Sequence, residues 1–391
     1  MTPTTSISTA PLSDATDPTV RPGSTEATEA TESIGVAVWG TGNMGRASIR
    51  AVVANPALHL AAVLVNDPAK VGSDAGELAG LGEALGVAAT NDIDAVLATS
   101  PGAVAYMASG DIRPDDAAAD IVRALGSGAV VVTPALYAMY DPLSAPAEVR
   151  QPLEEATTAG SSSLFVSGID PGWGNDILPA LIAGLGSTIE RITCQEIFDY
   201  STYDQPDAVR YLVGMGQPMD YEPPMVAAGV PTMVWGGQIR LLARALGVEL
   251  DEIREVLERR PLDHTVENSM GTFDAGTQGA MRFQIQGIHD GEAVLIVEHV
   301  TRIDSTCAPD WPVPADGGAG AHRVVVEGSP HIAVTIEASD EGGNRAAGGN
   351  ATAAGRLINA IPWLRAAPPG IYSGLDVPIE PPTGRLGRTK R

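Results

Sequence analysis

Short β-branched runs alternate with Ala- and Leu-rich stretches of helical length from Ile34 onward. The runs predict strands, and the stretches predict helices; the strands are 35–39, 58–65, 103–107, 129–133 and 163–166, and the helices are 44–54, 92–98, 115–125 and 148–159. Parallel strands need crossovers of about a dozen residues, which these helices supply. The pattern therefore predicts an α/β fold with a doubly wound parallel sheet and helices on both of its faces.

The pattern changes after about Gly186. It predicts a strand at 189–198, helices at 235–246, 250–259 and 351–360, and two antiparallel strand pairs at 280–287 with 293–303 and at 323–326 with 332–338. The first pair turns at Asp290-Gly291, residue types that tolerate a positive φ. An α+β domain with a largely antiparallel sheet is expected here, and "APPGIYSGLDVP" is expected to return to the first domain.

The domain limits follow from these changes in texture. Residues 1–33 have almost no large apolar side chain and are expected to be disordered, because they cannot bury enough surface to offset the entropy of ordering. Residues 34–170 form the predicted dinucleotide-binding domain, with 350–381 packing back on it. Residues 171–349 form the predicted substrate and dimerisation domain, and 382–391 form a basic tail.

The stretch "VAVWGTGNMGRASIRAV" places Gly40, Gly42 and Gly45 in GxGxxG register, directly after a strand and at the start of a helix. The first glycine permits a tight turn, the second lets backbone N–H groups approach a pyrophosphate, and the third lets helix pack on strand. This context favours an NAD- or NADP-binding loop over a merely tight turn. The loop also brings Thr41, Asn43 and Met44 to the cofactor.

The second strand ends in "VLVNDPAK", which gives conflicting signals about the cofactor. Asn66 and Asp67 lie where an acidic residue would bind the ribose 2′-hydroxyl of NAD, whereas Lys70 would pair with the 2′-phosphate of NADP. The choice between NAD and NADP stays open. Later strand ends place Ser109 and Thr133 near the nicotinamide.

A second glycine-rich loop, "GIDPGWGND", follows the last strand of the predicted parallel sheet. Ligands of such sheets bind beyond the carboxyl ends of the strands, so Asp170 and Asn175 are candidates for substrate binding or proton transfer. The alternative is that Asp170 forms a turn or caps the helix that follows.

Other candidates come from the second domain. "EIFDYSTYD" directs Glu196, Phe198 and Tyr200 to one sheet face, so Tyr200 and Tyr203 are expected to line the substrate site. His264, in a polar stretch, is kept as a possible site residue. His299 lies in an apolar strand and is expected to be a satisfied core histidine, and His59, His289 and His322 are expected to be structural or solvated.

Composition excludes several classes of protein. The net charge of −24 disfavours nucleic acid as a partner. There is no apolar run of about 20 residues for a membrane span and no signal-peptide pattern, so we expect a cytoplasmic protein. HExxH and clustered Cys or His pairs are absent, so no metal site is predicted, and the absence of Gly-x-Ser-x-Gly argues against a hydrolase. Cys194 and Cys307 are expected to be reduced thiols.

Several segments together resemble the 2,4-diaminopentanoate dehydrogenase family, which includes native amine dehydrogenases and dihydrodipicolinate reductase-like proteins. They are "VWGTGNMGRASIRAV", "VGSDAGELAGL", "GIDPGWGND", "MRFQIQG" with "EHVTRI", and "RLINAIPWLRAAPPGI". The resemblance implies a Rossmann domain followed by an α+β substrate and dimerisation domain. It also implies NAD(P)-dependent interconversion of a small amine and a carbonyl compound through an imine, by a homodimer.

The sequence departs from that family's pattern in one respect that concerns the chemistry. The resemblance implies a glutamate just after the fifth strand, but the chain has "VVTPALYAMYDP" there, with no acid before Asp141. Tyr137 or Tyr140 would then donate a proton to a carbonyl, and Asp170 is the nearest candidate acid. The alternative is a non-catalytic NAD(P)-binding sensor or regulatory protein. The paired histidines, lysine and SGTA-like loop of true dihydrodipicolinate reductases are absent.

Overall fold

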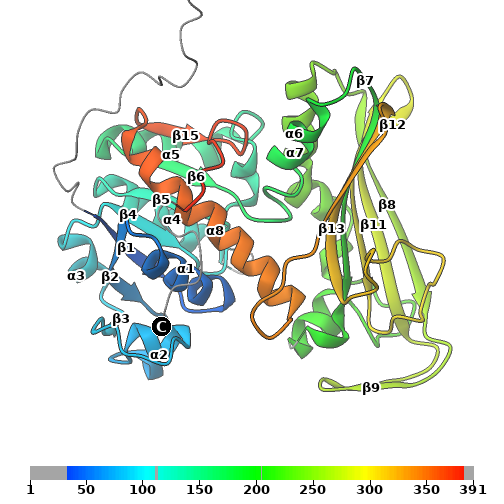
Figure 1. Cartoon of the computed structure of the whole chain (residues 1–391), viewed down its shortest axis with the longest axis horizontal. Helices are drawn as coiled ribbons and strands as arrows, with labels where there is room; N and C mark the ends of the chain where they lie inside the picture. Colours follow the sequence, from blue (N-terminus) through cyan, green and yellow to red (C-terminus); the bar gives the residue numbers. More distant parts are fainter. Residues whose placement is uncertain (1–32, 111–112, 204, 383–391) are drawn as a thin grey trace, which may run out of the picture. The chain divides into compact units, whose positions relative to one another are not determined.

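The computed structural model describes residues 33–110, 113–203 and 205–382 of the chain. These residues form a seven-stranded sheet, a six-stranded sheet and a small two-stranded sheet (Figure 1). The predictions of disorder in 1–33 and of a basic tail in 382–391 fall on residues that lie outside the described part, apart from Ser33 and Pro382.

The seven-stranded sheet is parallel throughout and has the order β15-β6-β5-β4-β1-β2-β3. The run 3-2-1-4-5-6 within it is the strand order of the Rossmann fold. Its strands are β1 (Ile34–Trp39), β2 (Leu58–Leu64), β3 (Ala89–Thr90), β4 (Ala103–Tyr106), β5 (Val130–Thr133), β6 (Ser163–Val166) and β15 (Gly370–Tyr372). The predicted doubly wound sheet is confirmed, and so is the return of the 367–378 segment, because β15 pairs with β6.

Helices bury both faces of this sheet. Side chains of α1 (Asn43–Ala54), α2 (Ala75–Ala79) and α8 (Arg345–Ala366) pack with Val36 and Val38 of β1. Side chains of α3 (Ile93–Ala98), α4 (Pro114–Gly126) and α5 (Ala147–Gly160) pack with Ala37 and Trp39 on the opposite face. The alternation along β1 thus divides one core into two, as a strand period of two requires.

The six-stranded sheet has the order β14-β13-β7-β12-β11-β8, in which only β7 and β12 run parallel. Its strands are β7 (Thr188–Asp199), β8 (Glu252–Pro261), β11 (Gln278–His289), β12 (Glu292–Arg302), β13 (Gly320–Ser329) and β14 (Ile332–Ile336). β9 (Val266–Asn268) and β10 (Gly271–Phe273) form the two-stranded sheet. The predicted turn of the β11–β12 hairpin is confirmed, with φ of 51° at Asp290 and 80° at Gly291.

The prediction of a helix at 250–259 was wrong, because these residues begin the edge strand β8. The apolar residues Ile253, Val256 and Leu257 have helical spacing, and Glu and Arg are good helix formers, so the segment itself favours a helix. Pairing with β11 overrides that preference. Its many charged residues are those expected on an exposed sheet edge.

The helices α6 (Ile177–Ala183) and α7 (Val230–Leu246) contact the six-stranded sheet, and Figure 1 shows them on the same side of it. α7 and α8 are longer than the sequence predicts. The extension of α8 has a local cause, because the Asn344 side chain caps it by accepting a hydrogen bond from the Ala347 amide at 3.0 Å. No helix among the described residues is long and apolar enough to cross a membrane.

Candidate active site

A cavity of about 1430 Å³ lies between the carboxyl ends of the Rossmann strands and the six-stranded sheet. Its walls include the glycine loop after β1, the ends of β2, β4, β5 and β6, and residues of β7, β12 and α7. The π-helical turn η4 (Ala208–Leu212) adds Ala208, Val209 and Leu212. The crevice beyond the carboxyl ends of the strands is where open α/β sheets bind their ligands.

The glycine loop fits a dinucleotide. Gly40 has φ of 102°, a conformation that favours glycine, and a Cβ on Gly45 would lie 1.9 Å from the Gly40 carbonyl oxygen. Gly42 lines the cavity, and a Cβ there would meet nothing within 4 Å. Gly42 also precedes α1 with no side chain capping the helix, so the free N–H groups of its first turn are available to a pyrophosphate.

The three polar residues predicted to meet the adenosine ribose lie at one end of the cavity, after β2. Asn66, Asp67 and Lys70 all line the cavity. The Asp67 carboxylate accepts a hydrogen bond from the Ala69 amide at 3.0 Å and so caps the short helix η1 (Pro68–Lys70). Lys70 Nζ lies 3.4 Å from Thr41 Oγ1 of the glycine loop. The Lys70 ammonium group therefore lies beside the glycine loop, whereas the Asp67 carboxylate is partly used to cap a turn.

The remaining cofactor candidates divide into two groups. Thr41, Asn43, Met44 and Ser109 line the cavity, as predicted. Gly45 and Thr133 do not line it: Gly45 provides close packing of α1, and Thr133 is fully buried, where its Oγ1 accepts a hydrogen bond from the Ala135 amide at 3.0 Å. Thr133 therefore shapes the turn after β5.

Asp170 projects into the cavity from the second glycine loop, with only 3% of its side chain exposed. Its Oδ1 accepts hydrogen bonds from Asn175 Nδ2 and Trp235 Nε1, both at 2.7 Å. The helix-cap alternative for Asp170 is wrong, because it is Asp176 that caps α6 by accepting from the Ile177 amide. Asn175 is fully buried outside the cavity wall, and its Oδ1 accepts from the Gly172 amide at 2.9 Å.

His299 is buried, as expected, but it lines the cavity and belongs to the site. Its Nε2 lies 3.2 Å from Asp170 Oδ1, close enough for an ion pair although the ring N–H is not aligned for a hydrogen bond. The ring stacks on Phe283 with centroids 4.5 Å apart. Burial lowers the pKa of His299, but the negative charges of Asp170 and Glu196 outweigh burial and raise it. Burial likewise raises the pKa of Asp170, but the interactions with His299 and His322 and the hydrogen bond from Asn175 together outweigh burial and lower it.

Glu196 completes the group, which we call the carboxylate–histidine cluster: Asp170, His299, Glu196 and His322. Glu196 lines the cavity with 18% of its side chain exposed. Its Oε1 lies 3.8 Å from His299 Nδ1, and its Oε2 lies 3.2 Å from His322 Nε2. His322 is buried and does not line the cavity, in keeping with the expected structural role, and its side chain contacts a cavity carboxylate.

Four tyrosines line the cavity as the sequence predicts: Tyr137, Tyr140, Tyr200 and Tyr203. Burial raises the pKa of Tyr140, Tyr200 and Tyr203, so these phenols keep their protons at neutral pH. The Tyr140 hydroxyl donates to the Pro134 carbonyl at 3.1 Å. Tyr200 and Tyr203 stack with centroids 4.9 Å apart.

His264 and Asp141 lie away from the cavity wall. The His264 side chain is 55% exposed and faces Asp263 and Asp304 before the small sheet, so the structure does not bring this candidate to the site. Its polar sequence neighbours reflect exposure to solvent. Asp141 is fully buried and paired with Arg244 of α7, and it therefore does not act as a cavity acid.

Asp170, Glu196 and His299 also have a spacing that could hold a metal ion, with one atom of each within 4.8 Å of the others. The chemistry of the donors argues against that use. Two N–H groups already donate to Asp170, and the raised pKa of His299 favours a protonated ring, which has no lone pair for a metal. The absence of a metal from the site stays a prediction.

The Rossmann sheet, its glycine loop and a cavity that joins that loop to ionisable groups of a second sheet define the class of NAD(P)-dependent oxidoreductases. Comparisons with known proteins agree. Residues 34–106 match the family model for the dihydrodipicolinate reductase N-terminus, and residues 175–388 match that for the 2,4-diaminopentanoate dehydrogenase C-terminal domain.

An amine dehydrogenase of Streptomyces virginiae is 67% identical over 356 residues, which cover 91% of this chain and 99% of that protein. The structure of an amine dehydrogenase from Mycobacterium smegmatis superposes with a TM-score of 0.71 at 19% identity, covering 92% of this chain and 98% of that one. A probable dehydrogenase from Thermotoga maritima has a TM-score of 0.52 at 14% identity, covering 88% and 92%. The chain belongs to the 2,4-diaminopentanoate dehydrogenase family and is an NAD(P)-dependent oxidoreductase.

Proposed function

We propose that the protein is an NAD(P)-dependent amine dehydrogenase whose substrate is a small amine without a carboxylate group. The charge of the cavity carries this proposal. Five acidic residues line the cavity, namely Asp67, Asp115, Glu148, Asp170 and Glu196. Lys70 is the only lysine or arginine among the described lining residues, and it lies at the adenosine end.

This distribution suits a cation and disfavours an anion at the substrate end. An amino or keto acid would place its carboxylate near Asp170 and Glu196 with no guanidinium or ammonium group among the described lining residues to pair with it. A protonated amine would instead be attracted to these two carboxylates. The apolar part of the substrate would contact side chains such as Met225, Met233 and Trp235.

The overall reaction is R₂CH–NH₃⁺ + NAD(P)⁺ + H₂O → R₂C=O + NH₄⁺ + NAD(P)H + H⁺. The cofactor, held at the glycine loop, supplies the acceptor for the hydride. The protein must then bind the ammonium group, take up a proton and hold water near the imine carbon. Asp170 keeps His299 protonated, Asn175 holds Asp170 in place, and Tyr137 and Tyr140 line the cavity beside them.

A carbonyl reductase is the second candidate, because Tyr200 lines the cavity and burial keeps its proton, so its hydroxyl would donate to a ketone oxygen. The two activities are separable. The purified protein would be given NADH or NADPH and a panel of small ketones, with and without ammonia. Turnover that requires ammonia supports amine dehydrogenation, whereas equal turnover without ammonia contradicts it. Tight cofactor binding with no turnover on the panel would support the non-catalytic sensor, which the similar proteins named above do not favour.

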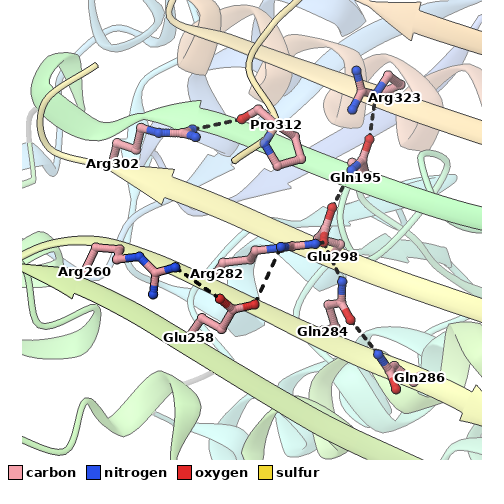
Figure 2. Close-up of polar contacts among 10 residues, drawn as sticks. All are labelled: Gln195, Glu258, Arg260, Arg282, Gln284, Gln286, Glu298, Arg302, Pro312 and Arg323. Atoms are coloured by element: carbon pink, nitrogen blue, oxygen red, sulfur yellow. Dashed lines mark hydrogen bonds and ion pairs between the residues drawn. The ribbon is translucent and has the colours of Figure 1, made fainter. Parts of the chain in front are cut away.

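The proposed partner is a second copy of the chain, bound through the face of the six-stranded sheet opposite α7. No helix of the described residues lies on this face (Figure 1). Figure 2 shows a line of polar side chains across it: Arg323 donates to Gln195 at 2.6 Å, Gln195 donates to Glu298, and Arg282 donates to Glu298 at 2.8 Å. Glu298 is only 1% exposed. A two-fold axis would bring the same patch of both copies together, and a patch that carries charges of both signs has groups of opposite charge to pair there.

Charge insertion tests this dimer. Val256 pairs with Gln284 across β8 and β11 and so shares the face drawn in Figure 2. Val256→Arg is expected to give monomers in light scattering, while Val53→Arg on α1 leaves the dimer intact. A monomeric wild-type protein would contradict the proposal.

A cytoplasmic location is also proposed, supported by two buried cysteines that are not joined in a disulfide.

A further inference from the structure

We infer that Glu196 is the carboxylate that binds the substrate ammonium and accepts its proton, and that Asp170 acts on the reaction only by positioning and charging His299. The inference rests on the proposed function and identifies the acid–base group within it. Asp170 and Glu196 both line the cavity, so sequence position does not decide between them. Their hydrogen-bond partners do.

Asp170 is the more strongly held of the two carboxylates. Its Oδ1 accepts from Asn175 and Trp235, and His299 Nε2 lies 3.2 Å from the same atom. The side chain is 3% exposed. A carboxylate held by two N–H donors and a buried cation is a poor proton acceptor, because each of these contacts stabilises its charged form. These contacts suit a group that fixes the ring of its neighbour.

Glu196 has fewer and longer contacts and is more exposed. Its side chain is 18% exposed in the cavity, and no described residue donates a hydrogen bond to Oε1. The nearest cation, His299 Nδ1, is 3.8 Å from Oε1, which is beyond hydrogen-bond distance. Oε2 is held from the other side by His322 Nε2 at 3.2 Å. One oxygen is therefore fixed, and the other is free to accept a hydrogen bond from a substrate N–H.

The sheet register places these groups in one row. Glu196 of β7 pairs with His299 of β12 in the parallel ladder and with His322 of β13 in the antiparallel ladder. Directly paired residues on neighbouring strands point to the same face, so the acid stands between two histidines on a rigid surface. Backbone pairing, rather than a mobile loop, thus sets the position of the proposed acid–base group.

The proton step follows from this arrangement. The ammonium group of the substrate binds Glu196 Oε1, one N–H bond breaks, and an O–H bond forms on the carboxylate. The electron pair of the broken bond stays on nitrogen, where it assists loss of hydride from the adjacent carbon and becomes part of the C=N bond. His322 holds the second oxygen in place during the transfer, and the proton later leaves to solvent as the H⁺ of the overall reaction.

The test compares Glu196→Gln with Glu190→Gln, the same substitution at an exposed position of the same strand. A positioned acid–base group contributes about 10²- to 10⁴-fold to rate. Glu196→Gln should therefore lower kcat for amine oxidation by about a hundredfold or more, with unchanged NAD(P)H binding and melting temperature. Glu190→Gln should match the wild type. Glu196→Asp should recover part of the activity, and serves as the second variant should Glu196→Gln not fold.

The split between kcat and KM adds a readout that a structural role would not move. Glu196→Gln should lower kcat for amine oxidation and leave the KM for the cofactor at the wild-type value, and Glu190→Gln should leave both unchanged. Ammonia-dependent turnover within threefold of the wild type in Glu196→Gln overturns the assignment to Glu196 alone. Wild-type turnover that is independent of ammonia overturns the proposed function instead, so the two failures are distinguishable.

Discussion

Asp170 Oδ1 lies 3.2 Å from His299 Nε2, and this contact joins the loop at the end of the Rossmann sheet to the middle of the second sheet. Both side chains are almost fully buried, and each charge supports the other: Asp170 raises the pKa of His299, and His299 lowers that of Asp170. The pair therefore holds the loop of the first sheet against the second sheet and favours the protonated form of His299.

Asp170→Asn keeps the shape of this side chain and removes its charge. Breaking a buried pair costs about 3–5 kcal/mol, and the variant should lose stability on that scale. Without the carboxylate, burial lowers the pKa of His299, so the ring should lose its proton at a lower pH than in the wild type. Thermal unfolding, and NMR titration of His299, measure the two effects.

The sign of the pH dependence is determined by the two shifts. The raised pKa of His299 gives stability that is fully present below its ordinary value of 6.5 and is lost as pH rises through the folded value. The lowered pKa of Asp170 gives stability that is present above its ordinary value of 3.8 and is lost as pH falls through the folded value. The stability of the wild type should therefore exceed that of Asp170→Asn most in the pH range where Asp170 is charged and His299 is protonated. Asp220→Asn, at an exposed acid, is the control; an equal effect there would refute the buried pair.

A second prediction concerns the glycine loop. Gly42→Val places a branched side chain where the backbone must approach the cofactor phosphates, while the local packing has room for it. We expect NADH and NADPH binding to be lost with little change in melting temperature. Gly355→Ala is the matched control, because a Cβ there meets nothing within 4 Å and α8 gains up to about 1 kcal/mol. Retained binding in Gly42→Val would show that the loop does not hold the pyrophosphate.

A third prediction addresses the choice of cofactor. Lys70 stands over the glycine loop, whereas the Asp67 carboxylate caps η1, so we expect a preference for NADPH. A hydrogen bond to a charged group contributes about 1.5–3 kcal/mol, which corresponds to about a tenfold to hundredfold change in affinity. Lys70→Ala should weaken NADPH binding on this scale and leave NADH binding nearly unchanged. Equal losses for both cofactors would mean that Lys70 does not meet the 2′-phosphate.

A fourth prediction concerns metals. Asp170, Glu196 and His299 are close enough for an ion, but their hydrogen bonds and charges suit proton transfer. Extended dialysis against a chelator should leave turnover unchanged. A loss that added zinc or magnesium reverses would show that the three side chains bind a metal, and the roles of Glu196 and His299 would have to be reassigned.

The fold was accessible from the sequence where local pattern and global structure agree. The strand β6 was predicted at its observed limits, because a short apolar run between glycine-rich segments has few alternatives. The strand β8 was not, because its helical spacing of apolar residues is overridden by pairing with β11. Strand pairing depends on tertiary contacts between residues far apart in the sequence, and a residue propensity scale does not include such contacts.

The site was predictable only on the Rossmann side. The glycine loops identify themselves by residue type and spacing, so Gly42 and Asp170 were found. His299 was placed in the core, because the register that sets it beside Glu196 joins strands about 100 residues apart. The one usable signal was alternation along β7, which put Glu196 and Tyr200 on the same face. His264 had a more typical polar context and lies outside the cavity.

The final prediction concerns the pair of Asp141 and Arg244, which fastens the turn bearing Tyr137 and Tyr140 to α7. Arg244 Nη1 donates to Asp141 Oδ2 at 2.9 Å, and Nη2 donates to the other oxygen. The two side chains differ in exposure: 0% for Asp141 and 39% for Arg244. Arg244→Ala leaves the buried Asp141 carboxylate without its cation and should lower the free energy of unfolding by about 3 kcal/mol or more. Asp141→Ala leaves an arginine that reaches water, so it should lower the free energy of unfolding by less. Urea unfolding of both single variants and the double variant measures this asymmetry; equal losses would show that packing at α7, rather than charge, holds the turn.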